Sequence, residues 1–208
     1  MSVYKDRGII LKEYAKGEYD RQLTVLLKDH GKVQLYAKGA RKPKSKLFAG
    51  TSLFSYSEFM VFEGNGFSSV TQVEIISSFH AVTADYERYC LACYFLELAN
   101  LMIHPGMRAD IILYLLLKAL QAICRENASP ALVSAAYKLK FMQLEGYSPD
   151  ESSIRDNGLA RVIEHILEAE VRNLFNMRLD EKTICKLANY SDSFIKENVD
   201  VNGGFYAH

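Results

Sequence analysis

The chain has 208 residues, of which 49% are hydrophobic and 24% are charged, and its formal net charge at pH 7 is zero. This composition is that of an ordinary globular protein of one large or two small domains, and it excludes a low-complexity chain. No apolar run approaches the roughly 18 residues that cross a bilayer, and the N-terminus MSVYKDRGII lacks the apolar region of a signal peptide. We therefore expect a cytoplasmic protein whose four cysteines form no disulfide.

The zero net charge conceals an uneven distribution. Residues 1–50 carry twelve Lys and Arg against five Asp and Glu, whereas residues 51–208 carry thirteen against twenty. Such asymmetry predicts two domains with different partners. The N-terminal basic region can still bind a polyanion, because salt screens charges that lie more than about 10 Å apart at 0.1 M ionic strength.

Five segments near the N-terminus are predicted to be strands: 7–14, 20–28, 31–38, 53–62 and 67–76. In the third, Val33, Leu35 and Ala37 alternate with polar neighbours, which is typical of a half-buried strand. The short turn DHG between the second and third strands predicts a hairpin. Five short strands in fewer than 80 residues indicate a small barrel, of which the OB-fold is the common five-stranded case.

After residue 80 the pattern becomes helical, with helices predicted at 84–103, 110–126, from Ser129-Pro130 to Gly146, 159–175 and 180–198. Thr83 is the predicted N-cap of the first, and Ser129 caps the third with a proline at its first position. The predicted fold class is α+β, with a five-stranded OB-fold barrel that binds nucleic acid at residues 1–80. A C-terminal all-α helical domain follows at residues 81–208.

The segment KGARKPKSK, residues 38–46, contains five basic residues in nine: Lys38, Arg41, Lys42, Lys44 and Lys46. One interpretation is a solvated connection between two strands, because lysine-rich loops are common. The other is a phosphate site, since Lys and Arg neutralise phosphates and small residues let a backbone come close.

The surroundings of this segment favour the phosphate site. The predicted barrel adds further basic residues, and three tyrosines on or beside its strands could stack on bases, although any one of them could equally serve packing. These residues are Lys12, Lys16, Arg21, Lys28, Lys32, Tyr14, Tyr19 and Tyr36.

Signals for other chemistry are weak. Cys90 and Cys93 have the CxxC spacing of zinc or redox sites, but no second pair exists, and i, i+3 positions in an apolar helix are more simply explained as core. The sequence contains no GxxxxGK[ST], HExxH, GxSxG or GxGxxG motif, so we expect no enzyme, no cofactor and no catalytic residue.

Several stretches resemble the RecO family of bacterial recombination mediators. They are GIILKEYAKGEYDRQLTVLLKDHGKVQLYAKGARKPKSK (8–46), FSYSEFMVFEGNGFSSVTQVEII (54–76), YFLELANLMI (94–103) and FMQLEGYSPD (141–150). The resemblance covers most of the chain in order. It implies an N-terminal OB-fold, a C-terminal helical domain and a nucleoid-associated cytoplasmic protein.

The resemblance also implies a function. Members bind single- and double-stranded DNA, anneal complementary strands and help to load recombinase onto DNA coated by single-strand-binding protein. Their partners are a RecR-type protein, the tail of single-strand-binding protein and, indirectly, the recombinase, with no membrane involved. The family's DNA contacts are carried over to Lys38, Arg41, Lys42, Lys44 and Lys46, with Arg21 as a weaker candidate.

The chain departs from the family in one place. Many members carry a four-cysteine zinc module after the segment that matches GYSPD here, but GYSPDESSIRDNGLARVIEHILE contains no cysteine. We therefore predict that the module is deleted and that the protein holds no structural zinc. Two other functions stay open. One is an adaptor whose basic loop binds an acidic protein tail or RNA. The other is a nuclease or ligase-like enzyme, which the absence of metal and nucleotide motifs disfavours.

Overall fold

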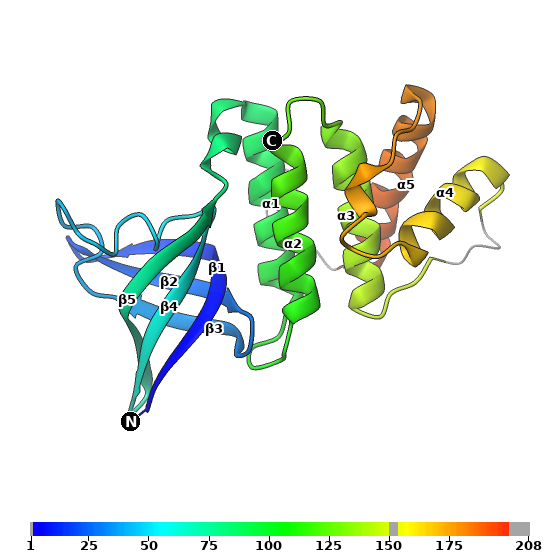
Figure 1. Cartoon of the computed structure of the whole chain (residues 1–208). Helices are drawn as coiled ribbons and strands as arrows, with labels where there is room; N and C mark the ends of the chain where they lie inside the picture. The colour runs from blue at the N-terminus through cyan, green and yellow to red at the C-terminus, as the bar shows by residue number, and fades with distance from the viewer. Residues whose placement is uncertain (1, 150–153, 200–208) are drawn as a thin grey trace. The chain divides into compact units, whose positions relative to one another are not determined.

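The computed structural model describes residues 2–149 and 154–199 (Figure 1). Five strands come first, followed by helices. The strands are β1 (Ser2–Lys16), β2 (Asp20–Leu27), β3 (Gly31–Ala37), β4 (Ser55–Gly64) and β5 (Phe67–Ser78). The helices are η1 (His80–Ala84), α1 (Tyr86–Met102), α2 (Asp110–Ile123), α3 (Pro130–Leu144), α4 (Asn157–Glu168), η3 (Leu174–Asn176) and α5 (Glu181–Asn198).

The strands close into a barrel in the order β1-β2-β3-β5-β4, with β1 also paired to β4. All pairs are antiparallel except β3 with β5. The predicted hairpin of the second and third strands is confirmed, because β2 and β3 pair through the turn that precedes Gly31. The five-stranded barrel followed by helices confirms the α+β fold class with an N-terminal OB-fold.

Alternate side chains of β2, β3 and β4 fill the barrel interior. Its core includes Leu23, Val25 and Leu35, joined by Phe59 and Val61 from β4. These alternate positions face inward because successive residues of a strand point to opposite sides of the sheet. The intervening residues of β1, β2 and β3 therefore face outward.

By its contacts, the chain divides into two compact units, Met1–Leu113 and Tyr114–His208. The first unit contains the barrel together with α1, which packs on β1. Lys32 Nζ donates to the carbonyl of Asn100 at 2.6 Å, and Lys12 Nζ lies 3.7 Å from Glu97 Oε1. The predicted division of the chain into domains at residues 1–80 and 81–208 stays a prediction.

The helix ends follow local capping chemistry. Ser129 accepts a hydrogen bond from the Leu132 amide at the start of α3, as predicted. The N-cap prediction for Thr83 was wrong, because the side chain of Asp85 caps α1 instead, and Thr83 lies within η1. The helix predicted at 159–175 was also wrong at its end, because α4 stops at Glu168 and only the short η3 follows.

None of the helices in residues 2–149 and 154–199 is long and apolar enough to cross a membrane.

Candidate nucleic-acid interface

The basic loop, residues 38–46, begins directly after β3 and leads through a series of turns toward β4. All five of its basic side chains are exposed. Their neighbour Ala40 is fully buried in the barrel core and fixes the loop to the barrel. The loop is therefore a surface feature that is anchored to the barrel core at Ala40.

The β1–β2 turn supports the basic loop from one side. The Arg41 amide donates to the Tyr19 carbonyl at 2.8 Å, and Arg41 Nη1 lies 3.3 Å from the carbonyl oxygens of Gly17 and Glu18. Lys42 Nζ lies 5.8 Å from the centroid of the Tyr19 ring. These contacts join the basic loop to a turn that is distant in sequence, and that turn brings the acidic Glu18 next to the loop.

Asp20 makes the second connection between the turn and the loop. Its carboxylate accepts hydrogen bonds from the Tyr36 hydroxyl and from the Gly39 amide, the latter at 2.6 Å. Both hydrogen bonds stabilise the charged carboxylate and so hold the pKa of Asp20 below its ordinary value. The bond from the Tyr36 hydroxyl has the larger effect, and the bond from the Gly39 amide follows it. Gly39 has φ +68°, a left-handed conformation that favours glycine, so the chain can turn here and present its amide to Asp20.

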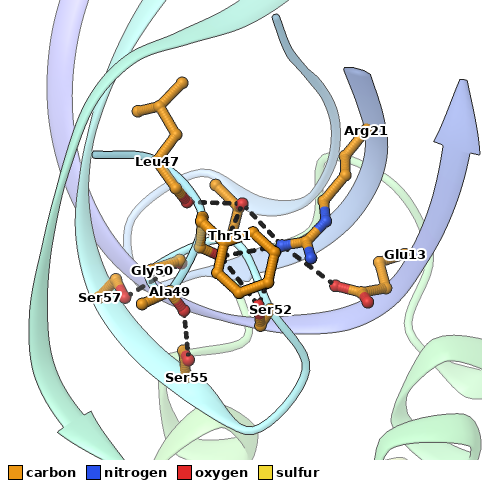
Figure 2. Close-up of polar contacts among 10 residues, drawn as sticks. Glu13, Arg21, Leu47, Ala49, Gly50, Thr51, Ser52, Ser55 and Ser57 are labelled. Carbon is orange, nitrogen blue, oxygen red and sulfur yellow. Dashed lines mark hydrogen bonds and ion pairs between the residues drawn. The ribbon is translucent and has the colours of Figure 1, made fainter. Parts of the chain in front are cut away.

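Arg21 lies on the opposite side of β2 from Asp20 and faces the end of the barrel. Its side chain is 9% exposed, and Nη1 donates to the Phe48 carbonyl, Thr51 Oγ1 and Ser52 Oγ at 2.9 to 3.0 Å. Figure 2 shows its guanidinium pointing at residues 47–52. Glu13 Oε2 lies 3.7 Å from Arg21 Nη1. The contacts support a positioning role for Arg21, and its predicted contact with DNA stays a prediction.

The four lysines of the basic loop form no close ion pair in the described part of the chain. They are Lys38, Lys42, Lys44 and Lys46. Lys38 and Lys42 lie within electrostatic reach of the Asp20 carboxylate, but exposed ammonium groups that form no close ion pair can still approach phosphate oxygens and release the counterions of a polyanion. They project from turns rather than from a helix that fits a groove, so they offer charge without a base-reading pattern.

A second feature, which the sequence did not reveal, is a pocket of about 890 Å³ in the unit Tyr114–His208. The buried side chains of Ala122, Val133 and Leu174 contribute to its lining, and the exposed Arg125 and Arg178 also line it. Arg125 Nη1 donates to Asn176 Oδ1 at 3.2 Å. Segments separated by about 50 residues form this pocket, so no local pattern could have predicted it.

The CxxC cysteines do not form a metal site with other residues of the described chain. Cys90 and Cys93 are half-buried thiols on α1, and burial raises the pKa of Cys93. No group of three or more His, Cys, Asp or Glu that could hold a metal occurs within residues 2–149 and 154–199. The residues present do not fit a four-cysteine zinc module. Part of the segment where that module is predicted to be deleted, residues 150–153, lies outside the described residues.

Comparison with known proteins gives two family matches. Residues 1–79 match the family described as "Recombination protein O N terminal", and residues 83–154 match "Recombination protein O C terminal".

Curated relatives carry the same family name. The chain is 28% identical to a "DNA repair protein RecO" of Acetivibrio thermocellus, over 97% of this chain and 94% of the relative. It is 36% identical to that of Desulfitobacterium hafniense and 33% identical to that of Moorella thermoacetica. Those two alignments cover 72% and 71% of this chain, and the chain spans about half (54%) of each relative. The Acetivibrio alignment runs over 236 positions, more than the 208 residues here, so that relative has segments which this chain lacks.

Proposed function

Because the chain belongs to the RecO family of DNA repair proteins, we propose that it binds single- and double-stranded DNA without sequence specificity and anneals complementary strands. In this proposal it also helps to load a recombinase onto DNA coated by single-strand-binding protein, together with a RecR-type partner. It acts by binding, without making or breaking covalent bonds.

The observation that carries the DNA-binding part is the basic loop. The loop carries five exposed Lys and Arg side chains. Contacts of Ala40 with the barrel core, of Asp20 with Gly39 and of the β1–β2 turn with Arg41 hold it in place. Phosphate contacts of this kind give affinity that is independent of sequence. Because two strands repel each other through their phosphates, a surface that neutralises both lowers the barrier to annealing for any complementary pair.

The first test is fluorescence anisotropy with labelled single-stranded DNA across a salt series. The wild type is compared with a variant carrying Arg41→Ala, Lys42→Ala, Lys44→Ala and Lys46→Ala. If the loop neutralises about four or five phosphates, the log–log salt slope of the wild type is about −3, from roughly 0.7 per phosphate. The variant should bind much more weakly, with a flatter slope.

A matched control removes four exposed basic side chains from the helical unit: Arg155→Ala, Arg161→Ala, Arg172→Ala and Lys182→Ala. It should bind DNA as the wild type does, although the same charge has been lost. Equal affinity and slope for the loop variant and the wild type would exclude the loop as the DNA site. If the loop variant instead lost only the binding of RNA or of an acidic peptide, the adaptor function would replace the proposed one.

Annealing needs a separate measurement, because a protein can bind DNA without joining strands. Two complementary oligonucleotides carrying a donor and an acceptor dye report annealing by energy transfer, in the absence of nucleotide and divalent metal. The wild type should accelerate annealing of unrelated sequence pairs to a similar extent, and the loop variant should not. Acceleration that required ATP or Mg²⁺ would favour an enzymatic function.

We further propose that the pocket of the helical unit receives the tail of single-strand-binding protein. Its lining is mixed: Leu132, Val133 and Leu174 suit apolar side chains, and Arg125 and Arg178 can pair with carboxylates of an acidic peptide, although Glu126 lines the pocket as well. A labelled tail peptide should bind the wild type and lose affinity in the variant Arg125→Ala with Arg178→Ala. If this variant bound the peptide with wild-type affinity, the pocket would be excluded as the binding site of the tail.

A further inference from the structure

Asp20 places a carboxylate at the base of the basic loop. It is the first residue of β2, and the register that sets Arg21 opposite Ala37 brings it beside the start of the loop. Its Oδ1 accepts a hydrogen bond from the Gly39 amide at 2.6 Å, and its Oδ2 accepts one from the Tyr36 hydroxyl. Both of these donors are uncharged groups.

Two lysines of the loop lie near the same carboxylate without pairing with it closely. Lys38 and Lys42 attract its charge, yet neither forms an ion pair with Asp20 among the residues that the structure describes. The side chain of Lys42 runs alongside Gly39, because a Cβ atom added to that glycine would lie 3.5 Å from Lys42 Cδ. The carboxylate thus has an amide, a hydroxyl and two ammonium groups around it.

These groups are of the kinds that bind a phosphate. Proteins contact the phosphates of nucleic acids with backbone amides, tyrosine hydroxyls and lysine ammonium groups. Gly39 has no side chain that would shield its amide from an anion. The hydrogen bond to Asp20 raises the pKa of Tyr36, so its hydroxyl keeps the proton that it donates. Because a carboxylate and a phosphodiester each carry one negative charge and accept hydrogen bonds, Asp20 stands where a phosphate would find its donors.

We infer that these four groups form a phosphate-binding site and that Asp20 occupies it until a nucleic acid displaces the carboxylate. The site consists of the Gly39 amide, the Tyr36 hydroxyl and the ammonium groups of Lys38 and Lys42. This inference rests on the proposed function of the basic loop. Asp20 is then an internal competitor that lowers the affinity of the loop. Because its carboxylate returns to the donors as the phosphate leaves, it also speeds the release of a bound strand.

A purely structural role for Asp20 predicts the opposite result. If the carboxylate only held the loop in place, neutralising it would loosen the loop and weaken the binding of DNA. If it competes with a phosphate, neutralising it removes a repulsion and strengthens binding, although the fold loses the charge of two charge-assisted hydrogen bonds. A variant that is less stable but binds DNA more tightly therefore distinguishes competition from support.

Anisotropy titrations with labelled single-stranded DNA compare the wild type with Asp20→Asn, which keeps an acceptor for the loop but removes the charge. If one more phosphate is bound, the log–log salt slope should steepen by about 0.7, and binding at 0.1 M salt should tighten by about fivefold. The gain should appear mainly as slower dissociation. The matched control Asp29→Asn removes an exposed carboxylate about 30 Å away, just beyond the other end of β2, and should leave the affinity unchanged.

A second measurement detects the site without DNA. The amide resonance of Gly39 is followed by NMR while inorganic phosphate is added to the wild type and to Asp20→Ala, in which the site is open. Phosphate should shift this resonance in the variant and much less in the wild type. Affinity of Asp20→Asn for DNA at or below that of the wild type, or a Gly39 resonance that phosphate leaves unmoved in Asp20→Ala, would overturn the inference. If the wild type bound no DNA but phosphate still shifted Gly39 in Asp20→Ala, the proposed function would fail and the phosphate site would stand.

Discussion

At the scale of single residues, the direction of an arginine side chain decides whether it stabilises the barrel or is available to a ligand. Arg21 and Arg41 are both basic residues near the barrel end. Arg21 has the inward parity of Leu23 and Val25 and is buried, whereas Arg41 lies in the loop and is exposed. Arg21 therefore fixes the backbone of residues 47–52, and Arg41 is available to solvent.

Replacing Arg21 should destabilise the barrel. Arg21→Ala removes three hydrogen bonds made by a buried charged group and leaves the buried Oε2 of Glu13 without its cation. We expect the free energy of unfolding to fall by about 3 kcal/mol in urea denaturation.

The double variant Arg21→Ala with Glu13→Ala should recover part of that loss, because it removes the unpaired carboxylate. Arg41→Ala is the matched control and should leave the urea midpoint unchanged. If Arg21→Ala unfolded at the wild-type midpoint but lost DNA binding, Arg21 would be a DNA contact rather than a positioning residue.

Asp20 should make the connection between the loop and the β1–β2 turn depend on pH. The hydrogen bonds from Tyr36 and Gly39 lower its pKa in the folded protein below the ordinary 3.8. Its stabilising contribution is therefore fully present above the unfolded pKa and is lost as the pH falls through the lower folded pKa.

Thermal unfolding of the wild type and Asp20→Asn between pH 6 and pH 2 tests this dependence. The wild type should be the more stable at pH 6, and the difference should shrink at pH values below about 4. A difference that stayed constant over the whole range would show that the charge of Asp20 does not matter.

At the scale of elements, Thr83 and Asp85 both have side chains suited to capping α1, but only Asp85 caps it. Asp85 accepts from the Arg88 amide at 2.9 Å, whereas the Thr83 hydroxyl donates to the His80 carbonyl within η1. Asp85→Ala should lower the free energy of unfolding by about 1 kcal/mol, because it leaves an amide of the first helical turn unsatisfied. Thr83→Ala should cost less. Chemical denaturation of the two variants measures both, and the reverse order would contradict the assignment of the cap.

Strand β1 contains a bulge that determines which side chains of its second half face outward. The pairing register with β2 shifts between Ile10 and Lys12, so Leu11 is an extra residue. A shift by one residue moves the following side chains to the opposite face. After the shift, Lys12, Tyr14 and Lys16 face outward, while Glu13 faces Arg21 at the barrel end. The outward direction of Tyr14 therefore depends on this bulge.

At the scale of the whole molecule, the basic loop and the pocket belong to different compact units. Their proposed ligands should therefore bind independently. The loop variant should keep its affinity for the tail peptide, the pocket variant should keep its affinity for DNA, and combining both sets of substitutions should add their effects. Anisotropy titrations with both ligands measure this, and a loss of both affinities in either variant would show coupling or misfolding.

Metal removal is a further prediction for the whole molecule. No metal-binding group occurs within residues 2–149 and 154–199, and the only CxxC pair lies on α1. EDTA should therefore leave the thermal unfolding midpoint unchanged, and elemental analysis should find less than one zinc per chain. A midpoint that fell on chelation and recovered with zinc would contradict the predicted loss of the zinc module.

The amino-acid sequence by itself predicted most of the elements and the family, and DNA as the ligand stays a proposal. Alternation of apolar and polar residues predicted the strand at 31–38, and the cap Ser129 with Pro130 predicted the start of α3. The helix predicted at 180–198 begins at Glu181. The density of Lys and Arg at residues 38–46 marked the exposed loop, because charges concentrated over a few residues are a local property. The family resemblance followed from the same local stretches.

Only the tertiary structure decided which side chains share a surface. The burial of Arg21, the outward direction of Tyr14 and Tyr36 and the support of the loop by Asp20 depend on strand register and on a one-residue bulge. The pocket combines α2, α3 and the segment before α5. Such features arise from pairing between distant residues, whose free energy depends on the packing of the folded chain, and a local sequence pattern does not encode them.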